Sequence, residues 1–426
     1  MKKNTFIVVL CALVALFSVS CADEPKPQPE PPKAVSVWDG EAVNTAWYSE
    51  EKTDFVLDEA SQLAGFAKLV NEGSSFEGKT ISLVVDMDLA GNPWTPIGTK
   101  TSMFSGSFDG NGKTISNLKI VEGSYVGLFG YVGDATIKGI TLENAQVSGA
   151  ERVGSLIGRI AGNASVSDCM ADGSSNVEGS GSNTGGLVAE IAGKVNVELK
   201  NLTSSALVKN TADSNSRAAG IVCQITSDAD VSISSCVNNG NVETNNGYAG
   251  GIVSAIQAGE TKVSMDGCSS EGVLSGDTKA ALVAWLSDGA YVEVSNYGSG
   301  IDSIGTIKGR GNRFHILFDG EELFVNALSE DAQLKMLYEG KGEMSKKTLD
   351  RIIGFYKYVK ETRPDWKIDC TTYWKVFTSL YFGEDGWPQC LAEYNKKTFE
   401  NSADYVTKDE ITGFDHTSKH LYVIGK

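Results

Sequence analysis

Histidine and proline are scarce in this chain of 426 residues, and basic residues are too few to balance the acidic ones. The three histidines, His315, His416 and His420, all lie late in the sequence, and no Cys-x-x-Cys pair occurs, so we expect no metal site and no cofactor. A net charge of −17 repels nucleic acid, and we expect no nucleic-acid partner. Five of the 9 prolines fall between residues 25 and 32, whereas the 47 glycines are spread widely. This composition predicts a turn-rich β protein with one stiff linker.

No hydrophobic run is long enough to cross a bilayer as a helix. The apolar stretch from Phe6 to Phe17 follows two lysines and has the length of a signal-peptide core. The segment ending at Ser20-Cys21 resembles a bacterial lipobox, which predicts a signal peptide over residues 1–20 and lipidation of Cys21. The alternative is plain secretion with cleavage near Ser20, which would leave Cys21 unmodified.

Residues 21–35 are rich in proline and cannot build a core, so they are interpreted as a spacer between a lipid anchor and a folded body. Asp23 and Glu24 follow the predicted lipidated cysteine. This acidic pair resembles the surface-export signal of Bacteroides-type lipoproteins. The resemblance implies a lipid-anchored protein exposed at the surface of the outer membrane.

Two short motifs repeat together about every 30 residues in the middle of the chain. The first is a small-small-apolar-apolar-small motif, whose first apolar residues are Leu128, Leu156, Leu187, Ile221, Ile252 and Leu282. The second is an apolar-x-apolar-x-x-apolar motif, which ends at Ile140, Cys169, Leu202, Cys236, Cys268 and Tyr297. Short strands at a fixed period without intervening helices predict a right-handed parallel β-helix, or β-solenoid, over residues 76–312. Equivalent residues should then stack in buried columns, and the three repeat cysteines should be inert core thiols.

The first repeats also carry a family resemblance. Phe104-Ser-Gly-Ser-Phe-Asp-Gly-Asn-Gly-Lys-Thr-Ile-Ser-Asn-Leu, followed by Val126-Gly-Leu-Phe-Gly, is similar to the GLUG-repeat family, and the likeness extends over roughly residues 38–300. Such repeats occur in bacterial surface lipoproteins, in adhesins and beside the catalytic domain of some immunoglobulin A proteases. The resemblance implies a β-helix with a surface role and no catalytic residues.

The segments on either side of the repeats have helical rather than strand-like sequence patterns. Apolar spacing between Leu57 and Asn71 predicts an amphipathic helix with Asp58 as its N-cap, and residues 36–75 are interpreted as an N-terminal helical cap over the solenoid. Residues 313–426 predict a small α-rich C-terminal domain. Cys370 and Cys390 lie 20 residues apart in that domain, outside the repeat columns, and form the disulfide candidate of an exported protein. Two independent buried thiols are the alternative.

These features predict a non-enzymatic lipoprotein with an adhesin-like or glycan-binding role, whose partners are the membrane lipid and a glycan or host-surface protein. One alternative is a polysaccharide lyase or hydrolase on a β-helix, which would need paired carboxylates. Asp168 and Asp266 do not pair, because they fall in different outward columns about three coils apart. Asp86 and Asp88 share one strand face, and the favoured interpretation is a solvated strand entry, with a Ca²⁺ site as the alternative. The other alternative is a structural spacer that presents the C-terminal domain.

Overall fold

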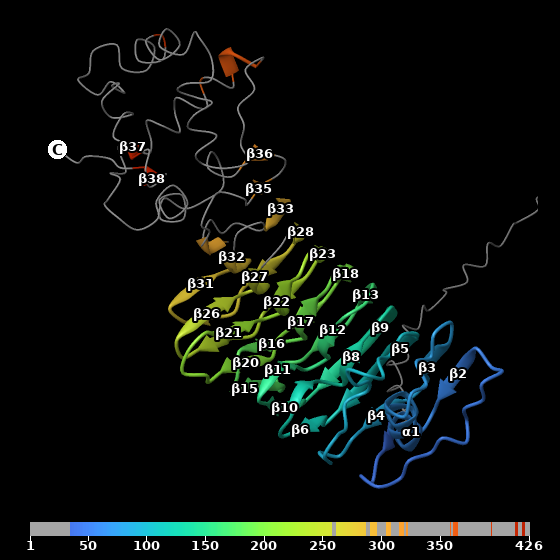
Figure 1. Ribbon diagram of the computed structural model, residues 1–426. Coiled ribbons are helices and arrows are strands. Elements are labelled where there is room, and N and C mark those ends of the chain that lie inside the picture. Colours follow the sequence, from blue (N-terminus) through green and yellow to red (C-terminus); the bar gives the residue numbers. More distant parts are fainter. Residues whose placement is uncertain are drawn as a thin grey trace, which may run out of the picture. The chain divides into compact units, whose positions relative to one another are not determined.

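The computed structural model describes residues 35–257, 261–286 and 290–295, together with short segments at 304–307, 315–318, 321–322, 358, 361–364, 393, 414–415 and 420–421. The described chain is mainly β and forms a parallel β-solenoid (Figure 1). Most of the predicted α-rich domain over residues 313–426 lies outside the described residues. The same is true of the predicted signal peptide over residues 1–20 and of nearly all of the predicted linker over 21–35.

Four stacked sheets, A to D, make the walls of the solenoid. In one complete coil the chain passes through sheets A, B, D and C in that order, for example through β9 (Ala135–Glu143), β10 (Gln146–Gly149), β11 (Glu151–Gly154) and β12 (Ile157–Ile160). Each of these strands pairs in parallel with its equivalents in the neighbouring coils. The core therefore runs the length of the stack, and each coil buries its apolar side chains against the next one.

Sheet A is 17-stranded and receives two strands from most coils. It contains β1 (Val35–Val37), β2 (Asp54–Leu57), β3 (Thr80–Leu83), β4 (Asp86–Asp88), β5 (Ser107–Ser116), β9, β13 (Ala164–Ser167), β14 (Met170–Ala171), β18 (Asn196–Lys200), β19 (Thr203–Ser204), β23 (Asp230–Ser234), β24 (Val237–Asn238), β28 (Lys262–Asp266), β29 (Ser269–Ser270), β33 (Tyr291–Ser295), β35 (His315–Phe318) and β36 (Glu321–Glu322).

The other walls are shorter. Sheet B contains β6 (Lys119–Ile120), β10, β15 (Asn176–Gly179), β20 (Leu207–Asn210), β25 (Val242–Thr244) and β30 (Leu274–Ser275). Sheet D contains β7 (Ser124–Val126), β11, β16 (Asn183–Gly185), β21 (Ser216–Ala219), β26 (Gly247–Gly250) and β31 (Thr278–Ala280). Sheet C contains β8 (Phe129–Val132), β12, β17 (Val188–Ala192), β22 (Val222–Thr226), β27 (Val253–Gln257), β32 (Val283–Leu286) and β34 (Ile304–Ile307). A separate antiparallel pair joins β37 (Phe414–Asp415) to β38 (His420–Leu421).

The predicted leucine column is confirmed. Leu128, Leu156, Leu187, Ile221, Ile252 and Leu282 are all buried in one apolar cluster. Adjacent members are linked through the backbone, since Leu156 N–H donates to the Leu187 carbonyl at 3.1 Å and Leu187 N–H donates to the Ile221 carbonyl at 3.3 Å. The described end residues of the second motif, Ile140, Cys169, Leu202, Cys236 and Cys268, are buried in the same cluster.

The last small residue of the first motif forms a second buried column: Gly130, Gly158, Ala189, Cys223, Ser254 and Ala284. Its members pack against the backbone of sheet D, because the chain folds back sharply between sheets D and C. The Ser254 hydroxyl donates to the Tyr248 carbonyl at 2.7 Å, and the Cys223 thiol lies 3.2 Å from the Arg217 carbonyl. A Cβ atom at Gly158 would collide with the Tyr125 backbone. Small side chains are therefore required wherever these two walls touch.

A bend in sheet A has its own sequence requirement. The residue just before the buried end of the second motif adopts positive φ in five successive coils, at Gly139, Asp168, Asn201, Ser235 and Gly267. Glycine, asparagine and aspartate tolerate this left-handed conformation best. The Asn201 amide also donates to the Asp168 carboxylate at 3.0 Å, which ties two adjacent bends together.

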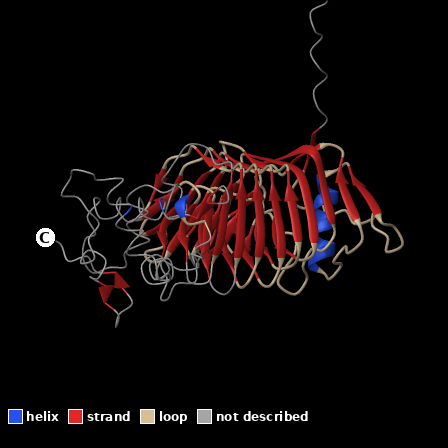
Figure 2. Ribbon diagram, turned by 90° about the horizontal axis from the view of Figure 1, so that it is seen from above, coloured by secondary structure: helices blue, strands red, loops and turns tan. Residues whose placement is uncertain are grey.

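The helix predicted near the N-terminus is confirmed as α1 (Ala60–Asn71). Its N-cap residue is Glu59 rather than Asp58, and Gln62 completes a capping box with it. The interpretation of this segment as a cap over the solenoid is not supported, because β2 precedes α1 and already pairs with β3 in sheet A. Figure 2 accordingly shows strands on both sides of α1 along the stack. Among the described residues, no helix combines the length and apolarity needed to span a bilayer.

Candidate functional site

The outer face of sheet A carries a shallow groove with a volume of ≈ 850 Å³. The groove crosses six strands, from β3 to β23. Outward side chains of these strands stand in register and form one row along its floor: Thr80, Ser107, Thr136, Ser165, Glu198 and Ser232. Adjacent strands are about 4.8 Å apart, so the row offers hydrogen-bonding groups at a regular spacing.

A second row of polar residues borders the groove where each strand begins: Asp134, Asn163, Asn196 and Asp230. Part of the hydrogen-bonding capacity of these side chains is used in contacts between adjacent coils. The Asp134 carboxylate accepts a hydrogen bond from Asn163 N–H at 2.6 Å, and the Asn163 side chain accepts one from Asn196 N–H at 2.9 Å. The remaining donors and acceptors of this row face the groove, where a ligand rich in hydroxyl groups could bind.

Two carboxylates of the groove, Glu198 and Asp230, belong to neighbouring strands of the same face. Asp230 pairs with Asn196, and Ser232 pairs with Glu198, so the two acids are diagonal neighbours. The predicted separation of Asp168 and Asp266 remains correct, since they stand in different rows. The sequence of one repeat does not indicate that Glu198 and Asp230 are close, because they belong to different repeats and become neighbours only through the strand register.

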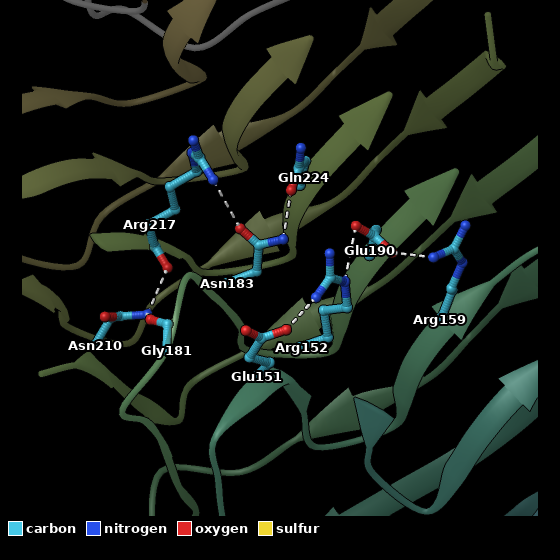
Figure 3. Close-up of polar contacts among 9 residues, drawn as sticks. All are labelled: Glu151, Arg152, Arg159, Gly181, Asn183, Glu190, Asn210, Arg217 and Gln224. Atoms are coloured by element: carbon cyan, nitrogen blue, oxygen red, sulfur yellow. Dashed lines mark hydrogen bonds and ion pairs between the residues drawn. The ribbon is translucent and has the colours of Figure 1, made fainter. Parts of the chain in front are cut away.

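A second polar surface lies on sheets D and C, and we name it the aromatic–arginine strip. It consists of two facing rows, one from each sheet. The sheet D row is Tyr125, Arg152, Asn183, Arg217, Tyr248 and Thr278. The sheet C row is Tyr131, Arg159, Glu190, Gln224, Ala255 and Trp285. Figure 3 shows the polar middle of this strip.

An ion-paired cluster is centred on Glu190, whose side chain is only 4% exposed. Its carboxylate lies 3.0 Å from Arg152 Nε and 2.8 Å from Arg159 Nη1 (Figure 3). Burial alone would lower the pKa of Arg152, but the charge of Glu190 and its hydrogen bond raise that pKa above its ordinary value. Arg152 also contacts Glu151, an acid whose side chain is 52% exposed.

In the middle of the strip, amide and guanidinium groups form a chain of hydrogen bonds. Arg217 Nη1 donates to the Asn183 side-chain oxygen at 3.2 Å, and the Asn183 amide in turn donates to Gln224 (Figure 3). The Gln224 amide donates to Gln257 at 2.6 Å. These hydrogen bonds connect successive coils through the planar guanidinium and amide groups of Arg217, Asn183, Gln224 and Gln257.

Aromatic rings lie at both ends of the strip. Tyr125 and Tyr131 are 4.6 Å apart between ring centroids, and the Arg152 guanidinium lies 4.9 Å from the Tyr125 centroid. Burial, followed by the hydrogen bond to Tyr125, raises the pKa of Tyr131 to about 12, so the Tyr131 phenol stays neutral. At the other end Tyr248 stacks on Trp285 at 5.5 Å, and Arg217 lies 5.6 Å from the Trp285 ring.

The sequence carries a signal for the strip in the spacing of its two rows from the leucine column. In five successive coils the sheet D row stands four residues before the leucine column, as Arg152 does before Leu156. In the sheet C row, Tyr131, Arg159, Glu190, Gln224, Ala255 and Trp285 all stand three residues after that column. Aligning the repeats on the leucine column therefore assembles both rows.

The residues singled out from the sequence have mixed outcomes. Cys21, Cys370 and Cys390 lie outside the described residues. Within the described part of the chain, Cys169, Cys223, Cys236 and Cys268 are free and buried, and burial raises the pKa of Cys169 and of Cys223 to about 12. These two thiols are therefore protonated and unreactive at neutral pH.

The carboxylates of Asp86 and Asp88 accept hydrogen bonds from the surrounding protein. The Asp86 carboxylate accepts a hydrogen bond from Thr114 N–H at 2.9 Å. The Asp88 carboxylate accepts hydrogen bonds from Ala90 N–H and from the Asn117 amide, both at 2.7 Å. Both acids thus link their strand to the neighbouring coil, through Thr114 and Asn117. Within the described ranges no group of three or more potential ligands could hold a metal ion.

Comparison with known proteins gives partial matches. No family model matches the chain. A "Putative Gly-rich membrane protein" of Evansella cellulosilytica is 28% identical over 117 residues, which is 26% of this chain and 13% of that protein. Halomucin of Haloquadratum walsbyi is 30% identical over 135 residues, or 29% of this chain and 1% of that protein. The "putative immunoglobulin A1 protease" of Bacteroides ovatus has a similar structure, with a TM-score of 0.48 and 20% identity over 64% of this chain and 85% of that one.

Proposed function

We propose that this chain is a GLUG-repeat-like lipoprotein, anchored through Cys21 at the outer surface of the bacterial outer membrane, which binds glycans in an adhesin-like role without cleaving them. The observation that carries the binding function is the open groove on sheet A. Its floor repeats hydroxyl groups at the strand spacing, with one carboxylate at Glu198, which suits a repeating polyol chain better than a compact small molecule. The lipobox-like segment and the proline-rich spacer support the anchor.

Binding by the groove is tested with a glycan array and purified protein. Replacement of Ser165 by Trp fills the groove floor and should weaken binding of any glycan that the wild type retains by at least about tenfold, or about 1.4 kcal/mol. Val273→Trp is the matched control, because Val273 is exposed and lies away from the groove. Absence of glycan binding by the wild type, or equal binding by Ser165→Trp, would refute this role.

The enzyme alternative is favoured by one observation, the adjacent carboxylates Glu198 and Asp230. A reducing-sugar release assay on the glycans bound in the array separates the two functions. If the wild type releases reducing ends, and Glu198→Gln with Asp230→Asn abolishes that release while binding persists, the protein is a glycan-cleaving enzyme. We expect no release from any bound glycan.

The lipid anchor makes a separate prediction. Cys21→Ala removes the only thiol at the proposed processing site, so the protein should move from the membrane fraction to the soluble fraction of cells. Metabolic labelling with a fatty acid, followed by fractionation, measures both modification and location. Unchanged labelling or unchanged membrane partitioning of the variant would contradict the anchor at Cys21.

A further inference from the structure

Two of the buried cysteines occupy the same position in successive coils. Cys236 follows β23 and Cys268 follows β28, and these two strands pair in parallel over their whole length. The register continues beyond the cysteines, where Val237 pairs with Ser269. The two cysteine backbones are therefore one strand spacing apart, about 4.8 Å. This spacing lies within the range of about 4.4–6.8 Å that separates the Cα atoms of a disulfide.

The two thiols have equivalent orientations and are hydrogen-bonded to each other. Each Sγ atom lies against the carbonyl two residues before it, at 3.4 Å for Cys236 and 3.6 Å for Cys268. The Cys268 Sγ atom also lies 3.5 Å from the Ile233 carbonyl, in the coil that holds Cys236. The hydrogen bond between the thiols raises the pKa of Cys236 and lowers the pKa of Cys268, so Cys268 ionises first.

The other described cysteines have no such neighbour. Cys169 belongs to the same column, but Leu202 occupies the coil between it and Cys236. Cys223 belongs to the column of small residues, which packs against sheet D. Among the four cysteines that the structure describes, Cys236 and Cys268 are therefore the pair that stacks directly from one coil to the next.

We infer that Cys236 and Cys268 are a site of oxidative cross-linking, where a disulfide joins two successive coils of the solenoid. The oxidant is a small-molecule disulfide. The Cys268 thiolate attacks one of its sulfur atoms, forms a mixed disulfide and releases one small thiol. Cys236 then loses its proton and attacks the Cys268 sulfur, which releases the second small thiol. Two protein thiols are oxidised, and one external disulfide is reduced to two thiols.

Burial decides when this exchange takes place and how long the bond lasts. The Cys236 side chain has no exposed surface and that of Cys268 is 2% exposed, so the oxidant reacts while the chain folds or while these coils are open. Once the core has closed, the bond is protected from reductants. It connects positions 32 residues apart, and a cross-link of that span stabilises a fold by restricting the unfolded chain. Because β23 also carries Asp230 and Ser232, the cross-link holds the last strand of the groove to the next coil.

The test equilibrates the purified full chain in a buffer of oxidised and reduced glutathione, with enough urea to permit local opening. Iodoacetamide then blocks the remaining thiols. A tryptic digest without reductant should contain peptide 218–262 linked to peptide 263–279. The linked form should melt at least about 5 °C above the reduced form. Cys236→Ala should abolish both the link and the difference in melting temperature.

Cys169→Ala and Cys223→Ala are the controls. Cys169→Ala removes a thiol from the same buried column, so it matches the packing loss at Cys236 but should retain the link. Cys223→Ala is needed because Cys223 and Cys236 lie in one tryptic peptide, and it should also retain the link. The inference would be overturned if the wild type forms no link, or if the link persists in Cys236→Ala or is lost in either control. A linked form that melts no higher than the reduced form would overturn it as well.

Discussion

Replacing Leu187 by Asp is expected to lower the free energy of unfolding by several kcal/mol and to leave the solenoid largely unfolded. Leu187 has no exposed surface and is stacked between Leu156 and Ile221, so no water or cation could reach the new carboxylate. Leu187→Ala provides a graded version, for which the lost contacts and the cavity should cost about 2–5 kcal/mol. Thermal and urea unfolding followed by circular dichroism measure both variants.

Ser167→Asp is the matched control for this prediction. Ser167 belongs to the second motif, in sheet A, but its side chain faces outward. It pairs with Lys138 on one side and Lys200 on the other. An aspartate at that position would stand between two lysines, and we expect a change within about 0.5 kcal/mol. Equal shifts in melting temperature for Leu187→Asp and Ser167→Asp would show that the register of the coils is wrong.

The second large effect is expected at Glu190. Replacing both Arg152 and Arg159 by Met would leave the 4% exposed Glu190 carboxylate without its two ion-pair partners. An unpaired buried charge of this kind costs about 3–5 kcal/mol, and urea unfolding should detect this loss directly. Adding Glu190→Met to the double variant should recover most of the stability, because the charge would then be replaced by apolar contacts.

The recovery in the triple variant is what distinguishes an ion-pair effect from lost packing. If the triple variant is as unstable as the double variant, the arginines stabilise the strip through their aliphatic stems instead. Lys138→Met serves as a surface control. Lys138 pairs with Asp109 at 3.1 Å, but its side chain is 46% exposed, so the change should be below about 1 kcal/mol.

The fold was largely predictable because the repeat period determines which residues stack. Once Leu128, Leu156 and Leu187 were aligned, their burial and the outward direction of Ser167 and Lys200 followed from strand alternation. The backbone fold between sheets D and C was not predictable in the same way. Glycine and alanine in the small column indicated a tight contact, but only the structure shows that the contact is with sheet D.

The candidate sites were harder to predict because they depend on neighbours about 30 residues apart. Glu190 lies three residues after Leu187. The alternation of side chains along its own strand does not show which residues contact it. Its two arginines come from the preceding coil. The groove on sheet A was equally hidden, since serine and threonine on outward positions are typical of any solvated strand. Register, rather than residue type, turns Thr136 and Ser165 into a continuous floor.

The repeated register of the coils makes the solenoid a molecule of adjustable length. Strands of the coil beginning near Leu187 pair with the coil before and the coil after through the same positions. Loss or duplication of one whole repeat, such as the stretch from Leu187 up to Ile221, would rejoin equivalent residues and keep every remaining strand paired. Each such event would shorten or lengthen the stack by about 4.8 Å. Recombination between repeats could therefore alter the length of the groove on sheet A, while the chemistry of each coil stays the same.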